Sequence, residues 1–183
     1  MQKIIIIDIE TTGFLNNGGK IVEIGIVELD LSNGNRKIIY DKVTHEKGIT
    51  LLEVENSWIV NNSSLTVDDI RYSKKLDLLK SEIQQIINNY PAGATAYNRS
   101  FDFNFLEDRG FVFPNKLDCP MLLSTDIIKL PGKFGSYKWP KVEEAYDFFF
   151  TDNNYIEKHR GADDAMHEAE IVYELYKLGF FKI

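Results

Sequence analysis

The sequence predicts an α/β fold in which helices cover a mixed sheet. Three strand-like segments come first, separated by a turn and a hairpin signal, so part of the sheet is antiparallel. A helical segment and one more short strand follow, and a helix crossover of this kind joins parallel strands. The rest of the chain is mostly helical. This order differs from the regular alternation of strand and helix that is typical of a doubly wound parallel sheet.

The three N-terminal strands are predicted from apolar runs and turn residues. Ile4 to Ile7 form an unbroken apolar run, as expected of a strand buried on both faces. Residues 16–19 read Asn-Asn-Gly-Gly and mark a turn before a long strand over 21–31. Asn33-Gly34 then predicts a hairpin into a third strand over 37–43.

Apolar residues at helical spacing predict the remaining elements. The first helical stretch ends before Pro91 and Gly93, and residues 94–97 read as a short strand of small residues. Ser100 is suited to cap the next helix. In chain order, the helices are expected over 76–87, from Ser100 to near Gly110, over 121–128, over 140–149 and over 163–178.

Length and composition set the class of protein. A chain of 183 residues with 44% hydrophobic content can bury a core, so we expect a single domain over 1–183. The single cysteine, Cys119, excludes an internal disulfide, and the apolar run at the N-terminus is too short for a signal peptide or a membrane span. We therefore expect a cytoplasmic protein with no membrane partner. The net charge of −7 argues against nonspecific coating of nucleic acid.

Two acids follow directly on the first buried strand. Side chains alternate along a strand, so Asp8 and Glu10 lie on the same face, about 7 Å apart. Two like charges at that separation repel each other, and a hard divalent cation removes the repulsion while accepting carboxylate oxygens. The pair is therefore a candidate half of a Mg²⁺ or Mn²⁺ site. The alternative is a strand end that meets solvent.

The last helix and two other segments carry further candidates. Asp164 heads the apolar stripe of the last helix, together with Glu168, whereas Asp163 lies on the polar side and complements the helix dipole. Asp102 lies in the first turn of its helix, which the preceding strand brings to the same end of the sheet as Asp8. His159 is either a surface residue or a general base, since its ordinary pKa of about 6.5 is close to working pH.

These motifs resemble those of the DEDDh 3′→5′ exonucleases of the ribonuclease H-like superfamily. Residues 8–13 match the first motif, Asp-x-Glu-Thr-Thr-Gly, and residues 20–25 resemble the family's following strand. Asp102 matches the second acid, and His159 with Asp164 five positions later matches the third motif. The resemblance covers nearly the whole chain in the family's order, and three motifs in order are far more specific than any one of them.

The resemblance implies a ribonuclease H-like, mixed five-stranded sheet flanked by helices. It also implies a phosphodiesterase in which two Mg²⁺ or Mn²⁺ ions, about 4 Å apart, are held by Asp8, Glu10, Asp102 and Asp164. His159 is the implied general base. The implied reaction removes nucleoside 5′-monophosphates stepwise from the 3′ end of single-stranded nucleic acid, with DNA favoured over RNA and a polymerase or repair protein as a possible partner.

The substrate contacts are less specific. The residues expected to meet the terminal nucleotide are Thr11, Thr12, Gly13, Phe14, Asn98 and Phe101. Phe14 and Phe101 are candidates for base stacking, although a core position is the simpler interpretation of each. Arg99, Lys138 and Arg160 are candidates for phosphate contact, with solvated surface charge as the default interpretation.

The segment over 44–64 carries no family signature, and its Trp58 is interpreted as a core anchor rather than part of the substrate groove. His45 and His167 are expected to be dispensable. The alternatives to an exonuclease are another ribonuclease H-like nuclease that cuts internally, or a noncatalytic nucleic-acid-binding or interaction domain. The oligomeric state is undetermined.

Overall fold

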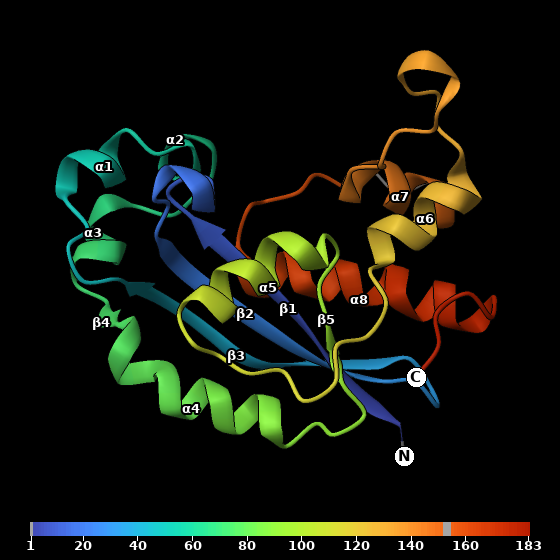
Figure 1. The fold of residues 1–183 in the computed structure, drawn as a ribbon, viewed down its shortest axis with the longest axis horizontal. Helices are drawn as coiled ribbons and strands as arrows, with labels where there is room; N and C mark the ends of the chain where they lie inside the picture. Colours follow the sequence, from blue (N-terminus) through green and yellow to red (C-terminus); the bar gives the residue numbers. More distant parts are fainter. Residues whose placement is uncertain (1, 152–154) are drawn as a thin grey trace.

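A five-stranded sheet in the order β4-β3-β2-β1-β5 runs through the centre of the protein (Figure 1). This computed structural model describes residues 2–151 and 155–183. The strands are β1 (Lys3–Thr11), β2 (Ile21–Asp30), β3 (Asn35–His45), β4 (Lys74–Lys75) and β5 (Ala94–Thr95). β1, β2 and β3 pair antiparallel, while β5 is parallel to β1 and β4 is parallel to β3. The predicted mixed five-stranded sheet is therefore confirmed.

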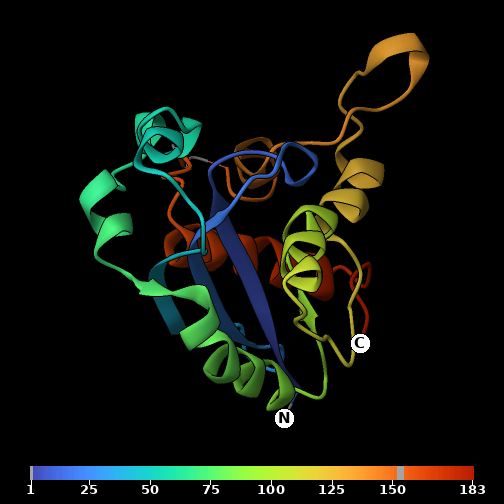
Figure 2. The ribbon, with the colours of Figure 1, turned by 60° about the vertical axis from the view of Figure 1, so that its left-hand side comes forward.

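The alternation of β1 assigns its isoleucines to two different cores. Ile4 and Ile6 pack with α8 (Gly161–Lys177), whereas Ile5 and Ile7 pack with α4 (Leu76–Asn88) on the opposite face, together with α5 (Arg99–Asp108). Figure 2 shows the sheet between these two layers. Because Asp8 and Glu10 continue the even-numbered positions, both acids lie on the face that α8 covers.

A cluster of short helices follows β3 and fills the segment that carries no family signature. These are α1 (Leu51–Glu55), α2 (Trp58–Asn62) and α3 (Val67–Arg71). α1 and α3 each begin with a capping box in which a threonine and an acid three residues later satisfy each other's backbone N–H groups. Their buried residues pack on Val22 of β2, so the cluster covers the end of the sheet where β1 reaches its acids.

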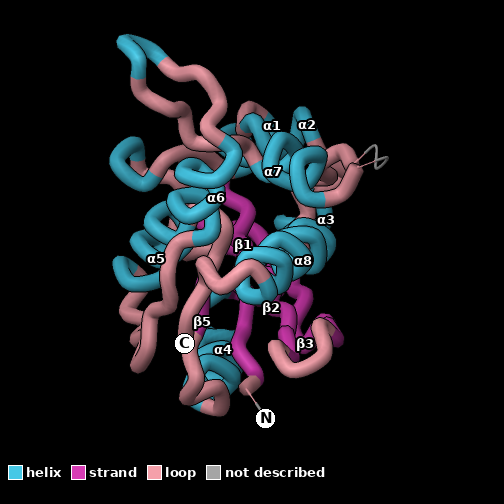
Figure 3. The backbone as a smooth tube through the Cα atoms, turned by 90° about the vertical axis from the view of Figure 1, so that its right-hand side faces the viewer, coloured by secondary structure: helices cyan, strands magenta, loops and turns pink. Residues whose placement is uncertain are grey.

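Two further helices, α6 (Pro120–Ile128) and α7 (Val142–Phe149), pack beside α8. Two 3₁₀ turns, η1 (Leu15–Asn17) and η2 (Lys133–Gly135), lie in loops. Figure 3 shows α6, the loop that contains η2, and α7 at the same end of the molecule. Within the described residues, no helix combines the length and the apolar character needed to cross a membrane.

Several predicted boundaries need correction. Strand β5 ends at Thr95 rather than Tyr97, because the chain turns there toward α5. The cap of α5 is Asn98, not Ser100, whose hydroxyl donates to the Asn98 amide oxygen at 3.1 Å. Helix α8 begins two residues earlier than expected and ends at Lys177, which leaves Leu178 exposed beyond the apolar stripe.

Candidate active site

Close backbone packing brings the start of α8 onto the sheet beside Asp8. Asp8 pairs with Gly25 of β2 in the antiparallel register. A Cβ atom built on Gly25 would lie 2.1 Å from the Ala162 nitrogen and 2.1 Å from the Gly161 carbonyl carbon, so only glycine fits under the first turn of α8. This contact places Asp164, which is 1% exposed, against the acids of β1.

Asp102 reaches the same place from the other side of β1. Strand β5 pairs with Ile5 and Ile6 and then ends, so the edge of β1 is open beyond them. At this open edge the Asp102 carboxylate replaces a strand partner and accepts the Ile9 backbone N–H at 3.1 Å. α5 thus delivers its first-turn acid to the strand end that carries Asp8 and Glu10.

The acids repel one another in a poorly solvated site. Burial raises the pKa of Asp8 well above its usual range, and the neighbouring carboxylates of Glu168, Glu10, Asp102 and Asp164 raise it further, in that order. Burial also raises the pKa of Glu10 and brings the pKa of Asp102 to about 8. Carboxylate oxygens crowded in this way are the donor set that a hard divalent cation requires, so the residues present fit Mg²⁺ or Mn²⁺.

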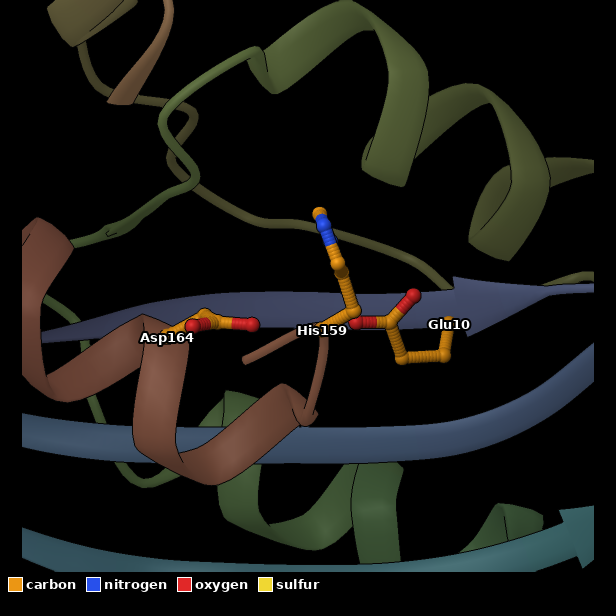
Figure 4. Close-up of side chains that lie close together, drawn as sticks. All are labelled: Glu10, His159 and Asp164. Atoms are coloured by element: carbon orange, nitrogen blue, oxygen red, sulfur yellow. The ribbon is translucent and has the colours of Figure 1, made fainter. Parts of the chain in front are cut away.

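His159 lies between two of these acids. One ring nitrogen of His159 and one carboxylate oxygen each from Glu10 and Asp164 lie within 4.8 Å of one another. Figure 4 shows the carboxyl groups of Glu10 and Asp164 pointing toward each other, with His159 between them. His159 has a φ of +53°, a conformation that bulky residues rarely adopt, which indicates that the surrounding structure holds it there.

Asp164 itself holds the segment around His159. Its carboxylate accepts the backbone N–H groups of Lys158 (3.2 Å) and Arg160 (2.8 Å), and the Tyr155 hydroxyl donates to it at 2.8 Å. The Tyr155 ring stacks in turn on His167, with ring centroids 4.1 Å apart. His167, expected to be dispensable, therefore supports a neighbour of Asp164.

Arg160 is not a solvated surface cation. Its guanidinium forms an ion pair with Glu23, at 2.6 Å from Nη2 to Oε1, and a hydrogen bond to the Ser64 hydroxyl at 2.9 Å. Glu23 is 0% exposed and also accepts the Gly161 N–H at 3.1 Å. The pair ties the residue after His159 to the first part of β2.

Trp58 is exposed, so its interpretation as a core anchor is wrong. The indole is 57% exposed on α2, and its edge meets the His159 ring at a centroid distance of 4.6 Å and an interplanar angle of 79°. Helix α2 is short and stands at the rim of the sheet, so its first residue reaches the site rather than the core.

Two further acids at the site were not given a role there by the sequence. Glu168 is 3% exposed, one helical turn after Asp164, and accepts the Tyr97 N–H at 3.2 Å. Burial and the neighbouring acids, first Asp102, raise its pKa. Burial followed by the charge of Asp164 raises the pKa of Glu157 to about 7. The position of Glu168 on the apolar stripe of α8 was a sequence signal that could have identified it. No sequence signal marked Glu157.

The residues predicted to contact substrate divide into two groups. Phe14, Asn98 and Phe101 line one pocket of about 240 Å³, where the rings of Phe14 and Phe101 meet edge to face at 6.5 Å. Phe14 is 70% exposed, so a core position is excluded for it.

Thr11, Thr12 and Gly13 shape the turn after β1 instead. The Thr11 hydroxyl donates to the Gly13 carbonyl at 2.9 Å, and the Thr12 hydroxyl accepts the Lys20 N–H at 3.0 Å. A Cβ atom on Gly13 would meet nothing within 4 Å, so this turn is open to close approach.

Comparisons with known proteins agree on one family. A model of the RNase T type of exonuclease matches residues 5–172. No curated protein sequence matches this chain.

Many solved structures share the fold. The nuclease domain of 3′hExo, described as a DEDDh family member bound to rAMP, has a TM-score of 0.68 at 15% identity, over 100% of this chain and 96% of that one. Pop2p of S. pombe, in its Mg²⁺- and Mn²⁺-bound form, has a TM-score of 0.63 at 12% identity, over 95% of this chain and 82% of that one. E. coli Exonuclease I in complex with a dA16 oligonucleotide has a TM-score of 0.64 at 16% identity, over 97% of this chain and 41% of that one. The ribonuclease H-like fold is therefore confirmed.

Proposed function

Because the chain belongs to the exonuclease family, with the DEDDh pattern of acids, we propose that it removes nucleoside 5′-monophosphates from the 3′ end of single-stranded nucleic acid. One observation carries this proposal. Carboxylates from β1, α5 and α8 meet at the open end of β1, where His159 lies between Glu10 and Asp164, although they are spread over more than 150 positions of the chain.

Each acid has a defined role in this proposal. Asp8, Glu10, Asp102 and Asp164 would hold two divalent cations, Mg²⁺ or Mn²⁺, as the crowding of their carboxylates favours. When bound, the cations would supply the positive charge that offsets the growing charge on the phosphoryl group. His159 would take the proton from the attacking water, and its neighbours Glu10 and Asp164 would stabilise the resulting imidazolium.

The pocket beside the acids suits the terminal nucleotide. Phe14 and Phe101 offer ring faces and edges for a base, and the Asn98 amide offers a donor and an acceptor for its polar edge. The open turn at Gly13 would let backbone groups approach the phosphate. The preference for DNA over RNA stays a prediction, because 3′hExo is described with an RNA mononucleotide and Exonuclease I with a DNA oligonucleotide.

Digestion of matched 5′-labelled oligonucleotides of DNA and RNA tests the proposal. With Mg²⁺ or Mn²⁺ we expect a ladder that shortens from the 3′ end, no reaction in chelator, and no reaction for Asp8→Asn. Asp77→Asn, an exposed acid on α4, is the matched control and should keep full activity.

Two outcomes would contradict the proposal. Internal cuts in an oligonucleotide with a blocked 3′ end would identify an endonuclease. The absence of Mn²⁺ binding in a calorimetric titration, together with no cleavage, would identify a noncatalytic domain.

A further inference from the structure

A loop over residues 129–141 projects from the body of the protein between α6 and α7, as all three views show (Figures 1, 2 and 3). Its own hydrogen bonds hold its shape. The Gly132 N–H donates to the Ser136 carbonyl at 2.8 Å, and the Lys138 N–H donates to the Leu130 carbonyl at 3.1 Å. η2 forms its tip. We call residues 129–141 the projecting loop.

The projecting loop concentrates positive charge on an acidic protein. It contains four lysines and no acid, in a chain whose net charge is −7. Lys138 forms an ion pair with Glu144 of α7, and the Lys129 ammonium lies 6.0 Å from the centre of the Tyr137 ring. Within residues 2–151 and 155–183, Lys133 makes no ion pair, so its charge is available to an anionic partner.

The loop also exposes aromatic rings. Phe134 at the tip is fully exposed, and Tyr137 and Trp139 are at least half exposed. Phe134 has a φ of +56°, a left-handed conformation that is uncommon for a bulky residue. An apolar ring in water contributes no burial to folding, and together with the strained backbone this indicates a role outside the fold.

The base of the loop is joined to the candidate active site. The Tyr97 hydroxyl donates to the carbonyls of Pro140 (3.0 Å) and Lys141 (3.2 Å), and Tyr97 directly precedes Asn98 of the nucleotide pocket. Glu143, in the first turn of α7, accepts the backbone N–H of Glu157 at 3.2 Å, two residues before His159. The loop therefore rises from the rim of the site.

We propose that the projecting loop is a second contact for a single-stranded nucleic acid, on the 5′ side of the terminal nucleotide. Phe134 stacks on a base, while Lys129 and Lys133 contact phosphates. Stacking accepts every base and lysine contacts every phosphate, so this grip is independent of sequence. It rests on the proposed function, and it predicts that the protein binds long strands more tightly than short ones.

Length-dependent kinetics test the proposal. For oligothymidylate of about 20 nucleotides, Phe134→Ala should raise KM about tenfold, the loss expected for one stacked base, with kcat unchanged. With a trinucleotide or the p-nitrophenyl ester of thymidine 5′-monophosphate, Phe134→Ala should react at the parent rate, because these substrates are too short to reach the projecting loop. Phe180→Ala and Lys182→Ala, exposed residues near the C-terminus, are the matched controls. Equal losses on long and short substrates, or no loss on either, would overturn the proposal.

Binding in chelator separates this inference from the proposed function. Fluorescence anisotropy with the same long oligothymidylate, and with oligouridylate, should show weaker binding for Phe134→Ala. Lys133→Ala should reduce the slope of log affinity against log salt by about 0.7. If the parent protein binds long strands through the loop but cleaves no substrate, the proposed exonuclease activity is refuted and the loop proposal is not. Unchanged binding in both variants, or a loop that instead mediates self-association in sedimentation, would refute the loop proposal alone.

Discussion

The indole of Trp58 meets the imidazole of His159 edge to face, at a centroid distance of 4.6 Å. The two residues come from α2 and from the segment before α8, and are about 100 positions apart in the chain. His159 already has an unusual backbone conformation, fixed by hydrogen bonds from Lys158 and Arg160 to Asp164. Trp58 adds a side-chain contact that fixes the direction of the ring.

Removing that contact should affect turnover. We expect Trp58→Ala to lower kcat about fivefold, the size of one lost aromatic contact, with Trp58→Phe close to the parent. Leu52→Ala, another exposed apolar residue of the same helical cluster, is the control. Steady-state kinetics on a trinucleotide would show the effect in kcat. A loss confined to KM would mean that Trp58 contacts substrate rather than His159.

His159 is the proposed general base, and its loss has a specific signature. His159→Ala should lower the rate at neutral pH by about 10²- to 10⁴-fold, with partial recovery at higher pH as hydroxide replaces the base. His45→Ala is the control, since His45 contacts Ser73 at the end of β3, and β2 separates β3 from β1, whereas His167 is unsuitable because it stacks on Tyr155. Parent-like rates across the pH profile would remove His159 from the mechanism.

The buried acids should make the metal-free protein less stable as pH rises. A carboxyl with a raised pKa binds its proton more tightly in the folded chain, so the free energy of unfolding falls between its ordinary and raised pKa. For Asp102 this interval runs from 3.8 to about 8, and for Glu157 from 4.5 to about 7. In chelator, the urea concentration at the midpoint of unfolding should therefore decrease as the pH is raised from about 5 to about 8.

Two comparisons check the cause of this pH dependence. Asp102→Asn keeps an oxygen for the Ile9 N–H but has no proton to lose, so its midpoint should depend less on pH. Added Mn²⁺ should stabilise the parent more at the higher pH, where protons no longer compete for the carboxylates. A midpoint that rises with pH in chelator would contradict the electrostatic description of the site.

The ion pair between Arg160 and Glu23 should contribute to stability through the buried partner. Arg160→Ala leaves the Glu23 charge buried without its cation, and we expect a loss of about 3 kcal/mol in the free energy of unfolding. Adding Glu23→Gln should restore part of it, because the neutral amide still accepts the Gly161 N–H. Lys158→Ala, an exposed neighbour paired with Asp163, is the control and should change stability by less than about 1 kcal/mol. Equal losses of stability for Arg160→Ala and Lys158→Ala would contradict the conclusion that the burial of Glu23 makes its ion pair the stronger one.

Local patterns explain which parts of the fold could be predicted. Alternation along β1 assigns Asp8 and Glu10 to one face before any packing is known, and helical spacing places Asp164 on the inner stripe of α8. Asn33-Gly34 marks the hairpin between β2 and β3. The short helices α1 to α3 escaped prediction, because each is too brief for a periodic pattern and depends on packing against Val22 and its neighbours.

The sequence by itself determined the mixed sheet, the two faces of β1 and the placement of Asp8 and Glu10 on one of them, because strand and helix periodicity are local properties. Only the tertiary structure decided that Trp58 touches His159, that Arg160 pairs with Glu23 and that Glu168 lies among the acids. Each of these contacts joins segments far apart in the chain, so it depends on how the helices settle on the sheet and not on the spacing of residues within any one of them.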